Sequence, residues 1–220
     1  MFCKELRYYF STPIAYLIIG LFAVTMALFL WFIPGEWNIP DNRYADLSGM
    51  FQLAPWLLML LCPALTMRLF AEEKTSGTWE LLRSKGITAR RIVLGKWGAA
   101  VCLTLIALCF CWLHYVLVYR LAEPVGNIDT GQFIGSWLGL CLLSVAFTSI
   151  GVLMASFSRS QLLSFIGGVV VCFVLYWTTI QAHFLSIARG VIYLSDVLYF
   201  VFIATVSLII AIYDQDWTTK

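Results

Sequence analysis

The sequence predicts an all-α membrane protein with six transmembrane helices, and three observations support this: composition, apolar run length and charge placement. Of the 220 residues, 61% are hydrophobic and only 12% are charged, and the mean hydropathy is +0.88. A soluble domain is usually about 45–50% apolar and about 25% charged. A chain of this composition could not cover its apolar surface in water, whereas lipid tails solvate such a surface. We therefore expect the chain to be embedded in a bilayer.

Six apolar runs are each long enough to cross a bilayer as one helix, and they cover approximately residues 14–33, 50–67, 97–119, 133–157, 162–184 and 197–213. None of them alternates at every second residue, as the strands of a membrane barrel do. Backbone amides in hydrocarbon must be paired within their own segment. Helices are therefore expected for all six runs.

The first run is expected to be a retained span rather than a signal peptide. Lys4 and Arg7 precede it, as basic residues precede the apolar core of a signal peptide. However, residues 14–33 would make about 30 Å of helix at about 1.5 Å per residue, and no small-x-small cleavage site follows. We expect one membrane domain over residues 1–220, without a soluble domain.

The lysines and arginines are distributed unevenly over the linkers, and this predicts the orientation of the chain. If the N-terminus is cytoplasmic, three of the 14 basic residues lie outside, namely Arg43, Arg120 and Arg189. The others then lie inside: Lys4, Arg7, Arg68, Lys74, Arg83, Lys85, Arg90, Arg91, Lys96, Arg159 and Lys220. Because basic residues are enriched on the cytoplasmic side, both termini are expected in the cytoplasm.

The linker between the second and third runs, residues 68–96, carries half of the basic residues. Pro63 precedes it and is expected to kink the second helix near the cytoplasmic face. Capping and breaking residues at 75–78 then predict a short amphipathic helix at 79–83, and Thr88 is expected to cap a helix that enters the third span. One or two helical turns are not stable alone in water. From the residues alone, docking on another protein and lying on lipid headgroups are equally favoured.

Catalysis inside the membrane is poorly supported by the sequence. A serine site needs a nucleophile beside a base, and an aspartyl site needs paired carboxylates, but the runs contain no Asp or Glu until their ends. His114 is expected to be a packed or hydrogen-bonded core residue. No GxxxxGK[ST] phosphate loop occurs, and the cysteines lack metal-ligand spacing. We therefore expect no catalytic residue, no metal and no cofactor in this chain.

A secondary transporter or a channel that works alone is the alternative reading. Ion-coupled carriers place ionisable residues or broken helices at mid-membrane. Here His114, with Gln52 and Gln181 near the outer ends, interrupts the apolar runs. This composition disfavours proton or sodium coupling and favours a permease whose energy comes from outside the membrane.

Several glycines in the fourth and fifth runs predict close helix packing. Small residues let two helical backbones approach each other in a membrane. The pattern does not distinguish contacts within one subunit from contacts at a dimer seam. The residues are Gly135, Gly139, Gly151, Gly167 and Gly168.

Two segments resemble the signature of ABC-2 type transporter permeases, and the similarity covers essentially the whole chain. In the first segment the matching residues are Pro63, Arg68, Glu72, Glu73, Gly77, Thr78, Glu80, Leu81, Leu82, Gly95 and Lys96. In the second segment they are His183, Phe184, Ala188, Arg189, Gly190, Val191, Asp196, Val197 and Tyr199. The subgroup most similar to this chain is that of the short gliding-motility-associated permeases. Ile192, Tyr193 and Leu194 make the second segment more apolar than is usual in that subgroup.

The resemblance implies a permease subunit of an ABC exporter in a bacterial inner membrane. A separate ATPase subunit would bind ATP and Mg²⁺, and a second permease, either the same chain or a related one with a large outer domain, would complete the complex. The partners expected are these proteins and membrane lipid, with no nucleic acid. The ATPase-coupling residues implied are Glu72, Glu73, Thr75, Gly77, Thr78, Trp79, Glu80, Leu81 and Leu82.

The resemblance also implies a short outer interfacial helix before the sixth span, near the exit gate. The residues of this gate region are His183, Phe184, Arg189, Gly190 and Asp196. The substrate itself is not indicated by the sequence. A low-charge interior is compatible with lipids, hydrophobic peptides, glycans or drugs.

Overall fold

The computed structural model describes residues 2–42, 44–75, 88–158, 160–190 and 193–217. That part of the chain contains helices and no strand. Six of its helical segments are long and apolar enough to cross a membrane: 15–32, 48–71, 89–121, 130–157, 161–188 and 194–216. The predicted six-helix fold class is confirmed.

The chain begins with a helix that the apolar runs did not predict. Helix α1 (Phe2–Ser11) is amphipathic and buries Glu5 and Tyr9. Thr12 separates it from α2 (Pro13–Ala27), where Pro13 stands in the first turn, a position at which proline costs no helical hydrogen bond. Helix α2 continues through a π-helical turn, η1 (Leu28–Phe32), to the end of the first span.

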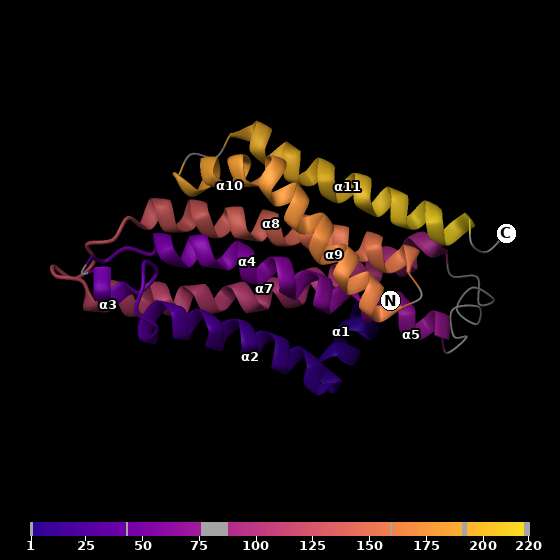
Figure 1. Ribbon diagram of the computed structural model, residues 1–220, viewed down its shortest axis with the longest axis horizontal. Coiled ribbons are helices and arrows are strands. Elements are labelled where there is room, and N and C mark those ends of the chain that lie inside the picture. The colour runs from indigo at the N-terminus through magenta and orange to yellow at the C-terminus, as the bar shows by residue number, and fades with distance from the viewer. Residues whose placement is uncertain (1, 43, 76–87, 159, 191–192, 218–220) are drawn as a thin grey trace.

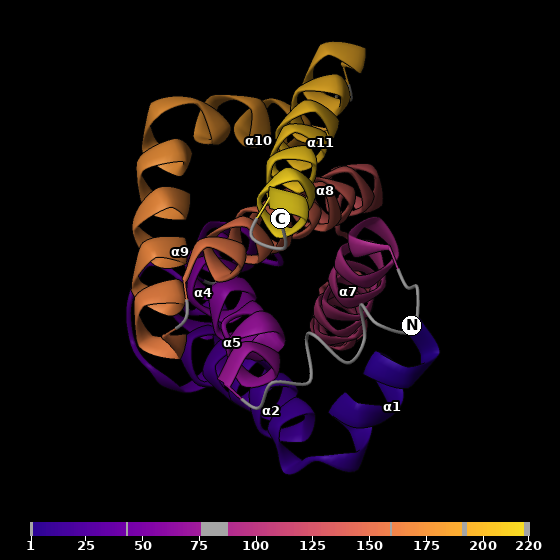
Figure 2. The ribbon, with the colours of Figure 1, turned by 90° about the vertical axis from the view of Figure 1, so that its right-hand side faces the viewer.

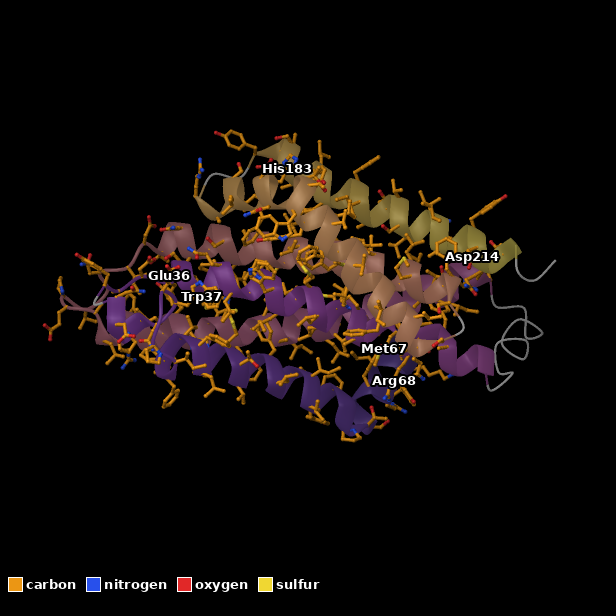
Figure 3. All side chains as sticks on the ribbon, viewed as in Figure 1. Glu36, Trp37, Met67, Arg68, His183 and Asp214 are labelled. Atoms are coloured by element: carbon orange, nitrogen blue, oxygen red, sulfur yellow. The ribbon has the colours of Figure 1, made fainter. Side chains whose placement is uncertain are left out.

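The second span is α4 (Ser48–Thr66), preceded by the short α3 (Ile39–Asn42) and followed by α5 (Arg68–Thr75). Met67 separates α4 from α5. Proline lacks an N–H group and disturbs the helical turn that precedes it, so Pro63 does not by itself explain a break that follows it. The Met67 N–H still donates to the Pro63 carbonyl at 2.9 Å, which closes the last turn of α4. Figure 3 labels Met67 and Arg68 at this break.

The third span, α7 (Ala89–Leu121), starts before its apolar run, as expected for a helix that continues beyond the hydrocarbon layer. Thr88 occupies the N-cap position of α7, but its side chain makes no capping hydrogen bond there. The fourth span, α8 (Thr130–Phe157), is capped by Asp129, which accepts a hydrogen bond from the Gln132 backbone N–H at 3.0 Å.

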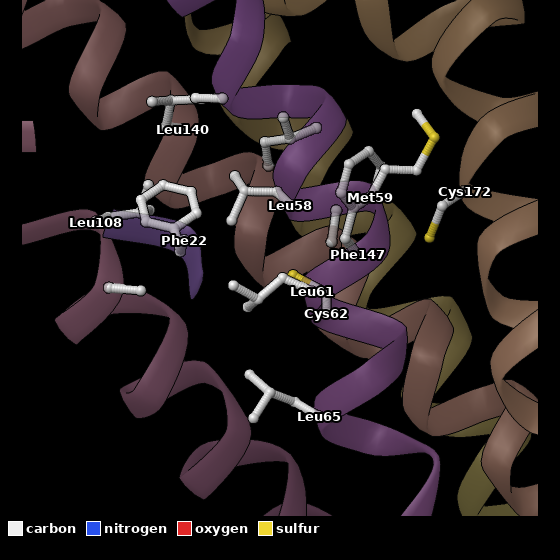
Figure 4. Packing of buried hydrophobic residues seen from close by; sticks show 14 of the residues in the cluster. Phe22, Leu58, Met59, Leu61, Cys62, Leu65, Leu108, Leu140, Phe147 and Cys172 are labelled. Atoms are coloured by element: carbon white, nitrogen blue, oxygen red, sulfur yellow. The ribbon is translucent and has the colours of Figure 1, made fainter. Parts of the chain in front are cut away.

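Helix α8 is the centre of the bundle. It contacts α4, α7, α9, α10 and α11, and it carries many buried small residues, among them Gly135, Gly139 and Gly151. Small residues allow close approach of neighbouring helices. Figure 4 shows the core beside it, where Leu140 and Phe147 of α8 lie close to Leu58 of α4.

The fifth span is bent. Helix α9 (Gln161–Leu175) passes through a π-helical turn, η2 (Tyr176–Ile180), directly into α10 (Gln181–Ala188). Figure 2 shows that α10 turns sharply away from the direction of α9. The short helix expected before the last span is therefore present as α10, and it is a continuation of the fifth span. The last span is α11 (Leu194–Trp217).

The bundle has two distinct ends. Helices α1 and α5 and the end of α11 lie toward the same end, and Figure 2 views the molecule from there. Helix α3 and the linker between α7 and α8 lie at the opposite end (Figure 1). We call these the α5 end and the α3 end.

Candidate functional site

The predicted ATPase-coupling residues lie at or beyond the α5 end. Glu72, Glu73 and Thr75 belong to the last part of α5. The other six, Gly77, Thr78, Trp79, Glu80, Leu81 and Leu82, lie outside the described residues. The coupling assignment therefore stays a prediction, and the structure defines the base from which this segment extends.

That base joins three helices through polar contacts. Glu5 of α1 pairs with Lys96 of α7, with 3.6 Å between Oε1 and Nζ, and both side chains are at least nine-tenths buried. The Tyr9 hydroxyl donates to the Leu65 carbonyl of α4 at 2.9 Å. The Lys96 ammonium also lies 5.7 Å from the centroid of the Phe70 ring of α5. Sequence reasoning missed Glu5 and Tyr9, although the spacing of apolar residues over 2–10 is typical of an amphipathic helix.

A pocket of about 460 Å³ opens at the α3 end, between α4, α8 and the bent fifth span. We call it the aromatic pocket. Its lining combines aromatic rings with amides, hydroxyls and one guanidinium: Trp37, Ser48, Phe51, Gln52, Trp56, Gln132, Ser136, Tyr176, Trp177, Gln181, Phe184, Leu185, Ala188 and Arg189. Its volume is in the range of about 300–1,000 Å³ that is typical of small-molecule sites.

The aromatic wall of this pocket is one connected cluster. The Trp56 ring centroid lies 6.1 Å from that of Trp177, 6.3 Å from that of Tyr176 and 6.4 Å from that of Phe173. Tyr176 also contacts Phe147 of the core at 6.4 Å. Edge-to-face and tilted pairs of this kind hold each ring in a defined orientation. The wall is therefore anchored to the bundle.

The polar residues of the pocket are of two kinds. The Ser136 hydroxyl is committed, because it donates to the Ala188 carbonyl at 3.1 Å and so ties α8 to α10. In the described part of the chain, the amides of Gln52, Gln132 and Gln181 have no hydrogen-bond partner. These amides are available to a ligand.

The structure divides the predicted gate residues between two faces of α10. Phe184 and Arg189 line the aromatic pocket. His183 lies on another face (Figure 3), where its Nδ1 is 2.8 Å from an Asp196 carboxylate oxygen and its ring stacks on Tyr199 at 4.1 Å between centroids. Asp196 is buried, so this contact connects α10 to the start of α11.

Gly190 follows the end of α10 with a positive φ of 85°. This backbone conformation is energetically unfavourable for residues that have a Cβ atom. Gly190 also lies against α8, because a Cβ placed on Gly135 would be 3.1 Å from the Gly190 Cα atom. The close packing predicted at Gly135 is thus a contact within one subunit. Gly139, Gly151 and Gly168 make such contacts too, with α10, α4 and α4 respectively.

His114 is a hydrogen-bonded core residue, as predicted. It is buried in α7, and its Nδ1 accepts a hydrogen bond from the Trp31 indole N–H at 3.2 Å. Among the described residues, no group of three or more His, Cys, Asp and Glu side chains could hold a metal ion.

Taken together, the six apolar helices and the pocket between them define a multi-pass membrane protein. Residues 47–194 match the family described as ABC-2 family transporter protein, and this match spans α4 to the beginning of α11. Because the match covers well over half of the chain, the protein belongs to this family, whose members are membrane components of ABC transporters. A search of curated proteins finds no match.

Proposed function

We propose that this chain is the permease of an ABC exporter, driven by a separate ATPase that docks on residues 68–96 at the α5 end. A second permease, the same chain or a related one, completes the pathway. The α5 end faces the cytoplasm of a bacterial cell, and the aromatic pocket opens toward the outer face of its inner membrane. Because two of its segments resemble gliding-motility-associated permeases, we assign the chain to that subgroup.

The observation that carries the proposal is the placement of α5. The family match includes the whole linker between α4 and α7, and α5 projects from the same end of the bundle as α1 and the end of α11 (Figure 2). Lys96 of α7 lies over the Phe70 ring of α5 and pairs with Glu5 of α1. Tyr9 of α1 donates to the Leu65 carbonyl of α4. A force applied to the segment by an ATPase would therefore be transmitted to α1, α4 and α7 together.

The proposed coupling helix is tested by replacing its apolar residues. The variant Trp79→Ala, Leu81→Ala, Leu82→Ala is expected to remain in the membrane while copurification of ATPase activity falls at least tenfold, because loss of packing area removes the docking surface. Transport is expected to be lost with it. The full-length chain is purified from its native membranes, and ATP hydrolysis is measured per mole of permease.

The control changes apolar residues at the other end. Leu121→Ala, Val125→Ala replaces two exposed side chains at the α3 end, and it is expected to retain the ATPase. If the triple variant keeps wild-type ATPase activity and transport, the coupling assignment is wrong. If no ATPase accompanies the wild-type chain, the alternative of a carrier or channel working alone is favoured.

A further inference from the structure

We propose that the aromatic pocket binds an anionic amphiphile, a molecule with an oxygen-rich anionic head group and an apolar body. The head group lies at Arg189, the amides of the pocket wall offer hydrogen bonds to its oxygen atoms, and the apolar body lies against Trp56 and Trp177. The claim that this ligand is the transported substrate rests on the proposed transport function. As a binding site, it stands on the pocket alone.

The lining of the aromatic pocket changes from polar to apolar along the bundle. On α4, the residues Ser48, Gln52 and Trp56 follow one another at successive turns, and the first and last are separated by about 12 Å at about 1.5 Å per residue. On the fifth span, Trp177 belongs to the turn before α10 and Arg189 stands beyond the far end of α10, with Gln181 and three apolar residues between them. A ligand that fits this gradient has a polar head and an apolar body.

Arg189 gives the pocket its charge preference. It is the sole charged residue among the described residues that line the pocket, and its guanidinium has no carboxylate partner in the described part of the chain. A guanidinium binds phosphate or carboxylate groups through paired hydrogen bonds. An anionic head group is therefore favoured over a neutral or cationic one.

The carboxylates near the pocket are already engaged. Asp46 and Asp129 line an adjacent recess. The Asp46 carboxylate accepts from the Ser48 backbone N–H at 3.0 Å, and Asp129 caps α8. Asp196 pairs with His183 on another face of α10. None of these three is among the residues that line the aromatic pocket, and within the described residues none of them forms an ion pair with Arg189.

The amides extend the head-group site. Gln52, Gln132 and Gln181 come from three different helices, and each amide offers two N–H donors and one carbonyl acceptor. Amide groups that remain without a protein partner at the wall of a pocket can hydrogen-bond hydroxyl and ester oxygens of a ligand. This set, with Arg189, suits a phosphate that carries a polyol or ester group.

The apolar part of the site leads out toward the lipid. Trp56 and Trp177 are 40% and 53% exposed, although both line the pocket. An acyl chain lying along the exposed surface of these two rings would pass into the surrounding hydrocarbon. Trp177 and Tyr176 also belong to the π-helical turn η2, and such turns occur frequently at functional sites.

The test measures lipid retention by the full-length protein, purified in neutral maltoside micelles and analysed by native mass spectrometry. The probes are dioleoyl phosphatidylglycerol, which is anionic, and dioleoyl phosphatidylcholine, which has no net charge. Wild-type protein is expected to retain the anionic lipid at least tenfold more strongly. Arg189→Gln is expected to abolish this preference, and Trp177→Ala is expected to weaken retention of the anionic lipid severalfold.

Arg120→Gln is the matched control, because Arg120 is an exposed arginine at the same end of the bundle and does not line the pocket. It is expected to leave the preference unchanged, and thermal unfolding of every variant checks that it is folded. Equal retention of the two lipids by wild-type protein, or equal behaviour of Arg189→Gln and Arg120→Gln, would overturn the proposal. Competition by free glycerol phosphate as effective as that by the whole lipid would also overturn it, since the ligand would then be a free phosphate.

The outcome is independent of the ATPase experiment. If the protein prefers the anionic lipid but no ATPase copurifies, the binding-site proposal would be supported and the transport function would be rejected. An ATPase that depends on residues 79–82, combined with no lipid preference, would retain the transport function and reject the ligand class.

Discussion

Gly151→Ala is expected to destabilise the folded protein by about 1–3 kcal/mol, the usual cost of overpacking a core. A Cβ atom at position 151 of α8 would lie 2.3 Å from the Thr66 Oγ1 atom and 3.4 Å from the Pro63 Cα atom of α4. Thr66 is fully buried, and its hydroxyl donates to the Cys62 carbonyl at 3.1 Å. The clash outweighs the advantage of up to about 1 kcal/mol that alanine has over glycine in a helix.

The measurement is the thermal unfolding midpoint of the purified protein, together with the monodisperse fraction after size exclusion. Gly20→Ala is the control, because Gly20 lies in α2 with open space around the position of a Cβ. Adding Thr66→Ala to Gly151→Ala removes the clashing oxygen and is expected to recover part of the loss. If Gly151→Ala were as stable as Gly20→Ala, the close contact of α8 with α4 would be wrong.

Lys96→Met is expected to lower the free energy of unfolding by about 3–5 kcal/mol, the typical penalty for leaving one member of a buried ion pair without its partner. The Glu5 side chain is 9% exposed and pairs with Lys96 at 3.6 Å. Loss of the ammonium leaves a carboxylate buried between α1 and α7. We expect α1 to detach from the bundle, which is measured as faster proteolysis within residues 2–11 and as a lower unfolding midpoint.

The double variant Glu5→Gln, Lys96→Met separates the effect of the pair from that of the lysine alone. Replacing both members of a buried pair is often nearly neutral, so the double variant is expected to be more stable than Lys96→Met. Arg91→Met is the control, since it removes a basic residue from an exposed position of the same helix. Should Lys96→Met and Arg91→Met unfold at the same temperature, the pair would contribute nothing to the docking of α1.

The six spans were predictable because they depend on local composition. A helix that crosses hydrocarbon needs about 20 apolar residues in succession, whatever it packs against. For the same reason α1 was missed, since its residues alternate with a helical period and form no apolar run. The glycines of α8 were also recognisable, because small residues mark close helix approach in membranes. Their partners, Thr66 and Gly190 among them, were not.

Part of the candidate site was recognisable before the fold was known. The family pattern singled out Phe184 and Arg189, and the scarcity of polar residues in the spans drew attention to Gln52 and Gln181. Gln132 and Trp177 were missed, since nothing in their own segments distinguishes them. They belong to the site only because the bend at η2 brings α10 against α8.

The sequence by itself thus determined the class of protein, the number of spans and the linker that the family match includes. Only the tertiary structure decided which faces of those spans are buried against other helices. The apolar 18-residue windows within spans 130–157 and 194–216 have equal mean hydropathy, yet 67% of the residues in the first window and 33% in the second are buried. Lipid and protein interior are similarly apolar, so a helix in a bilayer carries little hydrophobic signal of which side meets its neighbours. Packing of small residues and polar contacts makes that choice, and it is the arrangement of the helices that forms the aromatic pocket.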